Sequence, residues 1–554
     1  MTLDCLIIGY NDPPFESYER LIRSYGKDSE AYRDLQFSFV DMDGSPRTYV
    51  DLLNYVRREA AGAGAPVKPL YSGDIPNLAA AYLASFLRKY GFSAEYINLF
   101  QVEKEKLAHY LAQGPRCVAI TTTFYVINAP AIEIVDFVRH HNPATKIIVG
   151  GPLIGNHARR FGAERQIRIN AGSESGGSGI GQAFKTALAE IGADIYVVEG
   201  QGEATLVRIV DRLRRGADVR DIPNIVYMED GEYFRNPSEP EENDLDATDI
   251  DWFALSSEPL GHTIQMRTAR SCAFSCSFCN YPARAGKLRL AGLETIKREL
   301  DSIRRRGDVR NVVFIDDTFN VPLERFKEIC RLMIRERYGF NWYSYFRCSN
   351  SDQEAFDLMA ESGCKGVFLG IESGAPSILK LMNKAAKPEQ YEKGIRELKH
   401  RDILTFASFI VGFPGETEDT VKETVEFITR AKPDFYRAQL WYCEAGTPVE
   451  LKRAAFGIEG DGFIWRHHTM DSLTASDHIE RMFLIIRESA WLPQWSFDFW
   501  IIPYLCGQGI GREVFRRFMR EANKLLALQI ASVDPIQKRL AGEKHLGQMI
   551  RLFR

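Results

Sequence analysis

Short runs of consecutive apolar residues alternate with amphipathic segments over residues 1–230. Runs such as "DCLIIGY", "AEYINL", "CVAITTTF", "KIIVGGP" and "IYVVEG" are rich in β-branched residues and end at turn residues, which predicts buried strands. Helices are predicted between them, in "IPNLAAAYLASFLRKYG" and at 103–113, 130–141 and 181–191. This alternation predicts an α/β fold with a doubly wound, mostly parallel sheet of the Rossmann or flavodoxin type.

A second series of strand and helix patterns runs from residue 262 to residue 445. Its predicted strands are "TIQMRTA", "NVVFIDD", "WYSYFRC", "GVFLGIES", "LTFASFIVGF" and "YRAQLWY", and its helices are 292–305, 323–337, 353–362, 388–400 and 418–430. Six units are fewer than the eight of a closed TIM barrel, so the pattern predicts an open, partial (β/α)6 barrel. The aromatic-rich end of the chain predicts a helical C-terminal domain.

Two irregular segments suggest where the domains divide. Residues 236–258 are acidic, contain prolines and lack periodicity, which is typical of a linker. Residues 171–179, "AGSESGGSG", are typical of a flexible loop. The expected domains are 1–235 with a partly helical insertion at 11–75, the linker 236–258, the barrel 259–450 and a cap or substrate-facing domain at 451–554.

Composition and charge exclude several classes of partner. The chain has 554 residues, 45% of them hydrophobic, and a formal net charge of −4, so no basic excess favours a nucleic acid or an anionic membrane. No apolar run approaches a membrane span. The first ten residues lack a basic region and predict a strand instead of a signal peptide, so we expect a cytoplasmic protein without a disulfide framework.

Three of the ten cysteines, Cys272, Cys276 and Cys279, form one cluster in "SCAFSCSFCN". The other seven are isolated, which favours small buried side chains. Three clustered thiolates indicate a metal site: a zinc site completed by a distant ligand, or a [4Fe–4S] cluster. With three protein thiolates, such a cluster keeps one iron open for a small molecule.

The C-x-x-x-C-x-φ-C spacing resembles the signature of the radical S-adenosylmethionine (SAM) superfamily. "VFIDDTFN" (313–320), "GIESG" (370–374) and "IVGFPGETEDT" (410–420) resemble, in order, the segments that line SAM in that superfamily. The resemblance implies a [4Fe–4S] cluster on the three cysteines, and SAM on the open iron. The implied SAM-binding residues are Phe278, Asp316, Asp317, Arg347, Glu372, Ser373, Gly412 and Gly415. Taken alone, "GFPGET" is also compatible with a tight turn in which Glu416 caps the next helix.

The N-terminal domain resembles the cobalamin-binding domain of one large class of radical SAM enzymes. "AITTTF", "IIVGGP" and "YVVEGQGE" resemble the strand ends that surround cobalamin there, although each is also compatible with an ordinary turn. The implied contacts are Thr121, Thr122, Thr123, Gly150, Gly151, Pro152, Glu199, Gly200, Gly202 and Glu203. The D-x-H-x-x-G pattern that supplies a cobalt ligand in other cobalamin proteins is absent, so the lower axial position stays unassigned.

Further stretches, among them "DDTFNVPLERFKEI", "YRAQLWYCEAGTP" and "WRHHTMDS", resemble the PhpK-type radical SAM P-methyltransferases of phosphinate antibiotic biosynthesis. The resemblance implies transfer of a methyl group from methylcobalamin to an unactivated P–H or C–H centre of a small-molecule or peptide substrate. One SAM would remethylate cobalamin, and a second would give the 5′-deoxyadenosyl radical. A flavodoxin- or ferredoxin-like electron donor is also implied.

An anionic acceptor needs cationic or hydrogen-bonding partners near the mouth of the barrel. The candidates are Arg284, Arg437, Trp465 and His467. Each arginine is equally compatible with a contact to the SAM carboxylate or with a structural ion pair, and His467 with a buried structural histidine.

Two other functions stay open: a cobalamin-binding radical enzyme that rearranges, cyclises or cross-links without methylating, and a non-catalytic cofactor-binding sensor.

Overall fold

The structure is a computed structural model that describes residues 2–12, 14–42, 44–62, 64–159, 181–256, 258, 260–493, 495, 500–531 and 535–554. The glycine- and serine-rich segment 171–179 lies outside these residues. The chain forms two compact units. The N-terminal unit comprises Met1–Pro13, Gly73–Pro259 and Ala283–Arg306, and the barrel unit comprises Pro14–Ser72, Leu260–Pro282 and Gly307–Arg554.

The N-terminal unit is built on a seven-stranded sheet of order β4-β1-β5-β6-β7-β8-β9. The first five strands in this order are parallel, and β8 and β9 are antiparallel. The strands are β1 (Cys5–Tyr10), β4 (Ala94–Leu99), β5 (Cys117–Thr121), β6 (Lys146–Gly150), β7 (Ile195–Val197), β8 (Ile225–Glu229) and β9 (Glu232–Arg235). The parallel part has the flavodoxin-like order, so the chain reverses direction between β1 and β5, where such sheets bind ligands.

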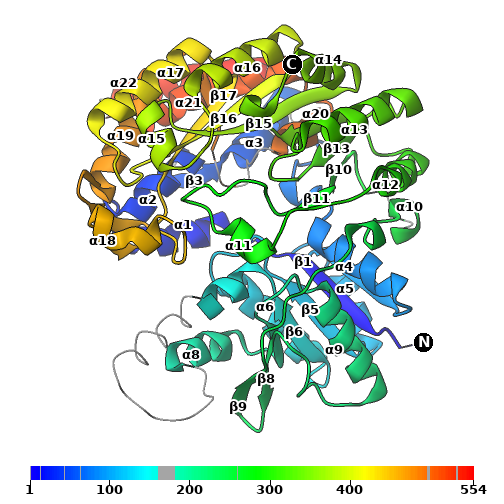
Figure 1. Ribbon diagram of the computed structural model, residues 1–554. Coiled ribbons are helices and arrows are strands. Elements are labelled where there is room, and N and C mark those ends of the chain that lie inside the picture. Colours follow the sequence, from blue (N-terminus) through cyan, green and yellow to red (C-terminus); the bar gives the residue numbers. More distant parts are fainter. Residues whose placement is uncertain are drawn as a thin grey trace. The chain divides into compact units, whose positions relative to one another are not determined.

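Helices cover both faces of this sheet, which confirms the doubly wound fold (Figure 1). They are α4 (Leu78–Lys89), α5 (Lys104–Ala112), α6 (Ala129–His141), α8 (Gln182–Ile191) and α9 (Glu203–Arg215). Apolar residues of α5, α6 and α8 share one core with alternate residues of the strands, such as Leu6 and Ile8. On the other face α4 contacts β1, β4 and α9.

The acidic segment 236–258 is packed against the N-terminal unit instead of forming an open linker. The Glu241 carboxylate accepts hydrogen bonds from the backbone N–H groups of Gly202 (2.7 Å) and Thr205 (3.1 Å) at the start of α9. Trp252, in α10 (Trp252–Leu255), is fully buried and donates its indole N–H to Glu299 of α12 (Leu293–Arg306) at 3.1 Å. Carboxylates of the expected linker, such as Glu241, therefore serve as partners of backbone N–H groups.

The barrel unit contains a second seven-stranded sheet, of order β10-β13-β14-β15-β16-β17-β21, in which every neighbouring pair is parallel. Its strands are β10 (Thr263–Met266), β13 (Asn311–Phe314), β14 (Asn341–Tyr345), β15 (Cys364–Glu372), β16 (Leu404–Val411), β17 (Phe435–Leu440) and β21 (Ala490–Trp491). The six predicted strands appear in the predicted order. The added β21 comes from the C-terminal region, and β10 and β21 remain the two edges of an open, partial barrel.

The two faces of this sheet differ in chemistry. On the outer face Phe314 and Trp342 pack edge-to-face, and Trp342 also contacts Phe326 of α13. The outer helices are α13 (Leu323–Glu336), α14 (Gln353–Glu361), α15 (Pro376–Leu381), α16 (Pro388–His400) and α17 (Glu418–Ala431), and Figure 1 shows α13, α14, α16 and α17 along this side. The strand register turns alternate residues, among them Gln265, Ser408 and Arg437, to the inner face. The inner face therefore carries these polar side chains next to aromatic ones, such as Phe406 beside Arg437.

Most of the insertion expected at 11–75 in the first domain, residues 14–72, belongs to the barrel unit. They form α1 (Phe15–Arg23), α2 (Glu30–Leu35), β2 (Phe39–Met42), β3 (Ser45–Thr48) and α3 (Tyr49–Ala61). Arg33 donates to Glu480 at 2.9 Å, and the backbone N–H of Asp41 donates to Gln529 at 2.7 Å. Contacts with residues more than 400 positions away decide this placement, and local periodicity cannot reveal them.

The C-terminal region combines helices with a small sheet. It contains α18 (Arg453–Phe456), β18 (Glu459–Asp461), β19 (Ile464–His467), β20 (Met470–Asp471), α19 (Ser472–Ile485), α20 (Ile501–Gly507), α21 (Arg512–Ile530) and α22 (Pro535–Arg551). The Pro503 carbonyl of α20 accepts hydrogen bonds from Thr263 (3.2 Å) and Asn311 (2.9 Å), at the amino ends of β10 and β13. Within the described ranges, none of the helices has the length and apolarity needed to cross a membrane.

Candidate functional site

The three clustered cysteines lie in a loop, residues 271–280, that follows the carboxyl end of β10 and the short strand β11 (Ala269–Arg270). Segment 381–384, after α15, holds this loop. The Ser277 backbone N–H donates to the Met382 carbonyl at 2.9 Å, and the Asn383 amide donates to the Ser275 carbonyl at 2.9 Å. The loop is thus fixed by backbone contacts from the segment that follows "GIESG".

The thiols themselves are partly enclosed. The Cys272 sulfur lies 3.7 Å from the Thr318 hydroxyl, and the Tyr281 backbone N–H donates to the Cys279 sulfur at 3.4 Å. Burial raises the pKa of Cys279, and the negative charges of Cys276, Asp317 and Cys272 add to the shift, so the three thiols are electrostatic neighbours.

Among the described residues, no three His, Cys, Asp or Glu side chains are gathered around a single point that would hold one metal ion. A [4Fe–4S] cluster does not require that arrangement, because each thiolate binds a different iron. The three thiols of the loop are compatible with such a cluster.

A buried ion pair lies beside the cysteine loop. The Lys384 ammonium is 2.8 Å from a Glu372 carboxylate oxygen, and both residues are more than 90% buried. Burial alone would lower the pKa of Lys384, but the charges of Glu372, Tyr391 and Cys276 outweigh it and raise that pKa. The same ammonium lies 5.6 Å from the centre of the Phe278 ring.

Glu372 ends β15 with φ of 70°, a left-handed conformation that is uncommon outside glycine and that turns the chain at this strand end. Lys384 had not been expected as a site residue. The sequence signal for it is the second lysine of "KLMNKAA", which follows the glutamate of "GIESG" by 12 residues.

Arg347 is a second buried cation at this edge. It follows β14, is 3% exposed, and its guanidinium lies 3.6 Å from the centre of the Phe274 ring in the cysteine loop. Its Nε donates to the Ser349 hydroxyl at 3.1 Å, whereas its Nη2, buried, has no hydrogen-bond partner. An arginine fixed by stacking and left with one unused donor is suited to binding a carboxylate or a phosphinate.

Asp316 and Ser373 are occupied by the protein itself. Asp316, buried after β13, accepts backbone N–H groups of Thr268 (2.7 Å) and Ala269 (2.9 Å), which ties β13 to the start of the cysteine loop. The Ser373 hydroxyl lies 3.2 Å from that of Thr424 on α17. The Asp316 and Ser373 side chains therefore position the site. Of the neighbouring carboxylates Asp316 and Asp317, Asp317 is the exposed one.

The turn after β16 is closed by Glu416 and covered by Trp465. Gly412 has φ of 87°, and a Cβ there would lie 2.3 Å from the Trp465 ring. Its N–H donates to the Glu416 carboxylate at 2.5 Å. Burial raises the pKa of Glu416 to about 8, although hydrogen bonds from Gly412 and Phe413 oppose the shift. Glu416 thus closes the turn itself, and Thr417 caps α17.

The two aromatic candidates from the C-terminal region hold this turn. Trp465 and His467 stack with ring centres 5.2 Å apart, and the Trp465 indole donates to the Trp441 carbonyl at 2.8 Å. His467 Nε2 lies 3.1 Å from the Gly412 carbonyl, and burial lowers the pKa of His467. Trp465 and His467 therefore both have partners within the protein, which agrees with the interpretation of His467 as a buried structural histidine. Gly415, with φ of 97°, packs against Leu381.

Arg437 lies on the inner face of the sheet and is largely buried, with its guanidinium 5.5 Å from the centre of the Phe406 ring. Next to it Gln439 donates to the Ser408 hydroxyl at 3.0 Å. Burial raises the pKa of Asp34, on α2, to about 6, and the charge of Arg437 opposes the shift. Segment 14–72 thus contributes a carboxyl group near Arg437 that the sequence did not indicate.

In the N-terminal unit the predicted cobalamin residues follow the carboxyl ends of β5 and β6. The Thr122 hydroxyl donates to the Gly150 carbonyl at 2.9 Å, and Thr121 is buried, whereas Thr123 is exposed. A Cβ on Gly151, whose φ is 114°, would lie 2.8 Å from the Thr122 hydroxyl oxygen. Pro152 begins the segment 152–159, which is helical.

The segment after β7 is held by the acidic region. Glu199 pairs with Arg235, and Glu203 accepts from the Asn243 amide at 3.0 Å. Gly200 and Gly202 both have positive φ, and a Cβ on Gly200 would lie 2.7 Å from Glu241. Arg284, near the end of α11 (Tyr281–Ala285), belongs to the same N-terminal unit and donates to Asn156 at 3.2 Å.

Apolar side chains are exposed at the carboxyl edge of the N-terminal sheet. Val102, Phe124 and Val126, which follow β4 and β5, are 71%, 46% and 72% exposed. An exposed apolar surface at the carboxyl edge, beside the reversal between β1 and β5, fits a large flat ligand. The residues present are therefore compatible with a corrin.

Two family descriptions match separate parts of the chain. The B12 binding domain matches residues 70–175, and the radical SAM superfamily matches residues 266–428.

Curated relatives agree with these domains. An uncharacterized methyltransferase of Pyrococcus horikoshii is 29% identical over 248 residues, which are 43% of this chain and 53% of the relative. The anaerobic magnesium-protoporphyrin IX monomethyl ester cyclase of Rubrivivax gelatinosus is 29% identical over 306 residues, 52% of this chain and 54% of the relative. The chain thus spans about half the length of these relatives.

Solved structures share the fold. The radical S-adenosylmethionine methyltransferase TsrM of Kitasatospora setae, with tryptophan and a SAM analogue bound, has a TM-score of 0.55 at 22% identity, covering 69% of this chain and 73% of TsrM. The cobalamin-dependent radical enzyme OxsB, with aqua-cobalamin and SAM bound, has a TM-score of 0.50 at 16% identity, covering 86% of this chain and 70% of OxsB. The two matched regions, the B12 binding domain at 70–175 and the radical SAM region at 266–428, imply a [4Fe–4S] cluster, SAM and cobalamin as cofactors.

Proposed function

We propose that the protein is a cobalamin-dependent radical SAM methyltransferase that methylates an unactivated P–H or C–H centre of a small anionic substrate. The observation that carries the proposal is the junction of the cysteine loop with the buried Lys384–Glu372 pair at the carboxyl edge of the barrel sheet. With their cofactors bound, the two domains would supply a one-electron reductant, a source of the 5′-deoxyadenosyl radical and a methyl carrier.

Cys272, Cys276 and Cys279 would hold the cluster, and the residues around them would receive SAM. Glu372, fixed by Lys384, presents a carboxylate suited to hydroxyl or ammonium donors. Arg347, with one unused Nη2, is suited to a carboxylate. Phe278 and the backbone at Gly412 and Gly415 would supply flat or closely approachable surfaces, and Asp317 an exposed carboxylate.

The carboxyl edge of the N-terminal sheet would receive cobalamin. Thr123 and the backbone near Gly150, Gly151 and Pro152 would offer hydrogen bonds, while Phe124 and Val126 would cover apolar ring surface. The segment from Glu199 to Glu203, with its glycines at 200 and 202, would leave room beside β7.

The methyl acceptor would lie along the inner face of the barrel sheet. Arg437 is the cation there, and Asp34 offers a carboxyl group near it. The Asp34 carboxyl forms no hydrogen bond or ion pair within the described part of the chain. A substrate that carries both an anionic group and an N–H donor, as an N-acylated amino-acid phosphinate does, would satisfy both side chains.

A second candidate function is favoured by one comparison. The relative from Rubrivivax gelatinosus bears the name of a cyclase, and it matches over 306 residues. A cobalamin-binding radical enzyme that cyclises or rearranges its substrate without methylation is therefore the alternative.

Anaerobic incubation of the reconstituted protein with SAM, methylcobalamin, reductant and candidate phosphinates tests the proposal. We expect a new phosphorus resonance and a mass increase of one methyl group in the product. Unchanged acceptors together with abundant 5′-deoxyadenosine would contradict P-methylation. Arg437→Gln is expected to lower product formation while it leaves the iron content unchanged, and Arg335→Gln, on the outer helix α13, is the matched control.

A further inference from the structure

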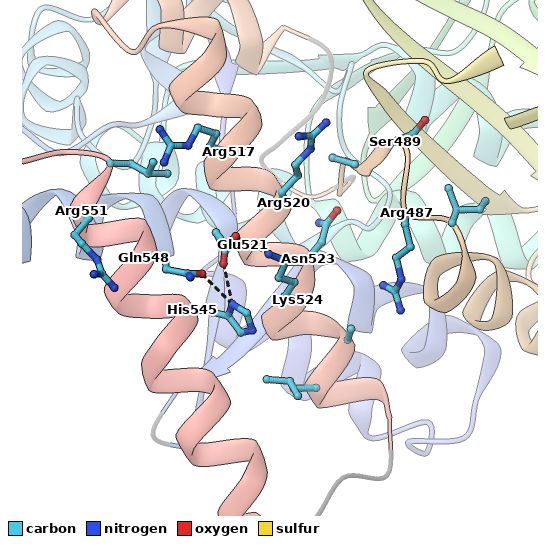
Figure 2. Close-up of a pocket in the computed structure, with 15 residues that line it drawn as sticks. Arg487, Ser489, Arg517, Arg520, Glu521, Asn523, Lys524, His545, Gln548 and Arg551 are labelled. Atoms are coloured by element: carbon cyan, nitrogen blue, oxygen red, sulfur yellow. Dashed lines mark hydrogen bonds and ion pairs between the residues drawn. The ribbon is translucent and has the colours of Figure 1, made fainter. Parts of the chain in front are cut away.

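A cavity of 780 Å³ lies in the C-terminal part of the barrel unit, between α21, α22, β21 and the segment after α19 (Figure 2). We call it the basic cavity. Its lining residues are Ile486, Arg487, Ser489, Ala490, Arg517, Arg520, Glu521, Asn523, Lys524, Ala527, Leu528, His545, Gln548, Arg551 and Leu552.

Five basic side chains and one acidic side chain line this cavity. Arg517, Arg520 and Lys524 recur at helical spacing and so share one face of α21, while Arg551 comes from α22 and Arg487 from the segment after α19. This charge excess contrasts with the chain as a whole, whose formal net charge is −4.

The one acidic residue is already occupied. The Glu521 carboxylate pairs with Lys524 at 2.7 Å and with His545 Nδ1 at 2.8 Å, as Figure 2 shows for the histidine. Across the described ranges, the side chains of Arg487, Arg517 and Arg520 form no hydrogen bond or ion pair. Neighbouring like charges repel, so an anion bound among them would be stabilised.

A buried polar group at the cavity wall also lacks a partner. Ser489 is 4% exposed, and its hydroxyl has no hydrogen-bond partner. A buried hydroxyl without a partner is costly unless a ligand or water completes its hydrogen bonds. The Ser489 hydroxyl and the guanidinium groups thus indicate the same kind of ligand, one with oxygens that accept hydrogen bonds.

The remaining walls of the cavity are apolar. Ile486, Leu528 and Leu552 line it together with two alanines. The volume lies within the range of small-molecule sites, which combine apolar walls with a few fixed polar groups. A ligand with several anionic groups and an apolar portion fits this lining.

The cavity is separate from the candidate active site. Ala490, in its wall, pairs with Phe435 at the amino end of β17, whereas the cysteine loop follows the carboxyl end of β10. A ligand in the basic cavity would therefore act as an effector or a structural ligand, independently of the proposed reaction.

We propose that the basic cavity binds a small polyanion that carries phosphate or carboxylate groups. Arg517 and Arg520 bind its charged oxygens, Ser489 donates to one of them, and the apolar wall contacts the rest of the molecule.

Isothermal titration of the full chain with pyrophosphate, ATP and citrate tests this site. We expect saturable binding of at least one probe, weakened about tenfold or more in Arg517→Gln/Arg520→Gln because charge-assisted hydrogen bonds are lost. Arg335→Gln/Arg337→Gln, which removes the same number of charges from two exposed residues at the end of α13, should bind as the unaltered protein does. If pyrophosphate binds more strongly than citrate, phosphate is the ligand group. If citrate binds more strongly, carboxylate is the ligand group.

Two results would overturn the proposal: no saturable binding of any probe at millimolar concentration, or unchanged affinity in the double variant. Circular dichroism and thermal unfolding establish that the variants are folded. Ser489→Ala keeps every charge, so a loss of affinity in this variant reports the hydroxyl contact alone.

Discussion

The ammonium of Lys384 lies 2.8 Å from the carboxylate of Glu372, and both groups are enclosed at the edge of the barrel sheet where the cysteine loop lies. The lysine comes from the segment that also holds the loop backbone, through Met382 and Asn383. One short stretch of chain therefore positions both the thiols and the carboxylate of "GIESG".

Lys384→Met should destabilise the protein by about 3–5 kcal/mol, because removal of one partner leaves the Glu372 carboxylate buried without compensation. Urea unfolding of the cofactor-free protein measures this free energy. The double variant Lys384→Met/Glu372→Gln, which removes both charges, should recover part of the loss. An unaltered unfolding free energy in the single variant would mean that the pair is not buried.

Gly412→Ala should destabilise the turn after β16 more than an equivalent change elsewhere. Its added Cβ would meet the Trp465 ring at 2.3 Å, whereas Gly446, with a similar φ of 80°, has no neighbour within 4 Å. Gly446→Ala therefore measures the backbone term alone, about 1–2 kcal/mol. The clash at Gly412 should add about 1–3 kcal/mol. Equal losses in the two variants would contradict the packing of Trp465 on this turn.

Glu416 should make the stability of the protein fall as the pH rises. Its pKa is raised from 4.5 to about 8 by burial, so the folded protein retains a proton that the unfolded chain releases. Its contribution is fully present below pH 4.5 and is lost between pH 4.5 and about 8, at up to about 1.4 kcal/mol per pH unit.

Glu416→Gln removes this titration and keeps an acceptor for the Gly412 N–H. The difference in unfolding free energy between the variant and the unaltered protein, measured at a series of pH values, should therefore change in favour of the variant across that window. A difference that is constant with pH would contradict the raised pKa.

The strand ends that carry the candidate site can be predicted from the sequence because each motif follows a short apolar run. "GIESG" and "GFPGET" end β15 and β16 as predicted, and the glycines at 412 and 415 adopt the positive φ that other residues rarely do. Parallel strands place their carboxyl ends at one edge, so spacing along the chain is sufficient to bring these motifs together.

Other features depend on partners that spacing does not reveal. The sequence predicts Asp316 as a SAM contact, and it does not reveal that the backbone N–H groups of Thr268 and Ala269 donate to this carboxylate. Segment 14–72 interrupts the first domain in sequence, yet Arg33 pairs with Glu480 in the barrel unit. Glu241 appears in a region of linker-like composition and caps α9. Each contact joins residues far apart in the chain, where periodicity carries no information.

The measurement that tests the central proposal most directly is the quantity of 5′-deoxyadenosine and S-adenosylhomocysteine formed from SAM by anaerobically reconstituted protein with cobalamin and reductant. We predict both products from the unaltered protein and from Cys330→Ala, which changes a buried cysteine outside the loop. We predict no 5′-deoxyadenosine from Cys276→Ala. Absence of 5′-deoxyadenosine from the unaltered protein, or its formation by Cys276→Ala, would contradict radical chemistry at this loop, and 5′-deoxyadenosine without S-adenosylhomocysteine would contradict methyl transfer.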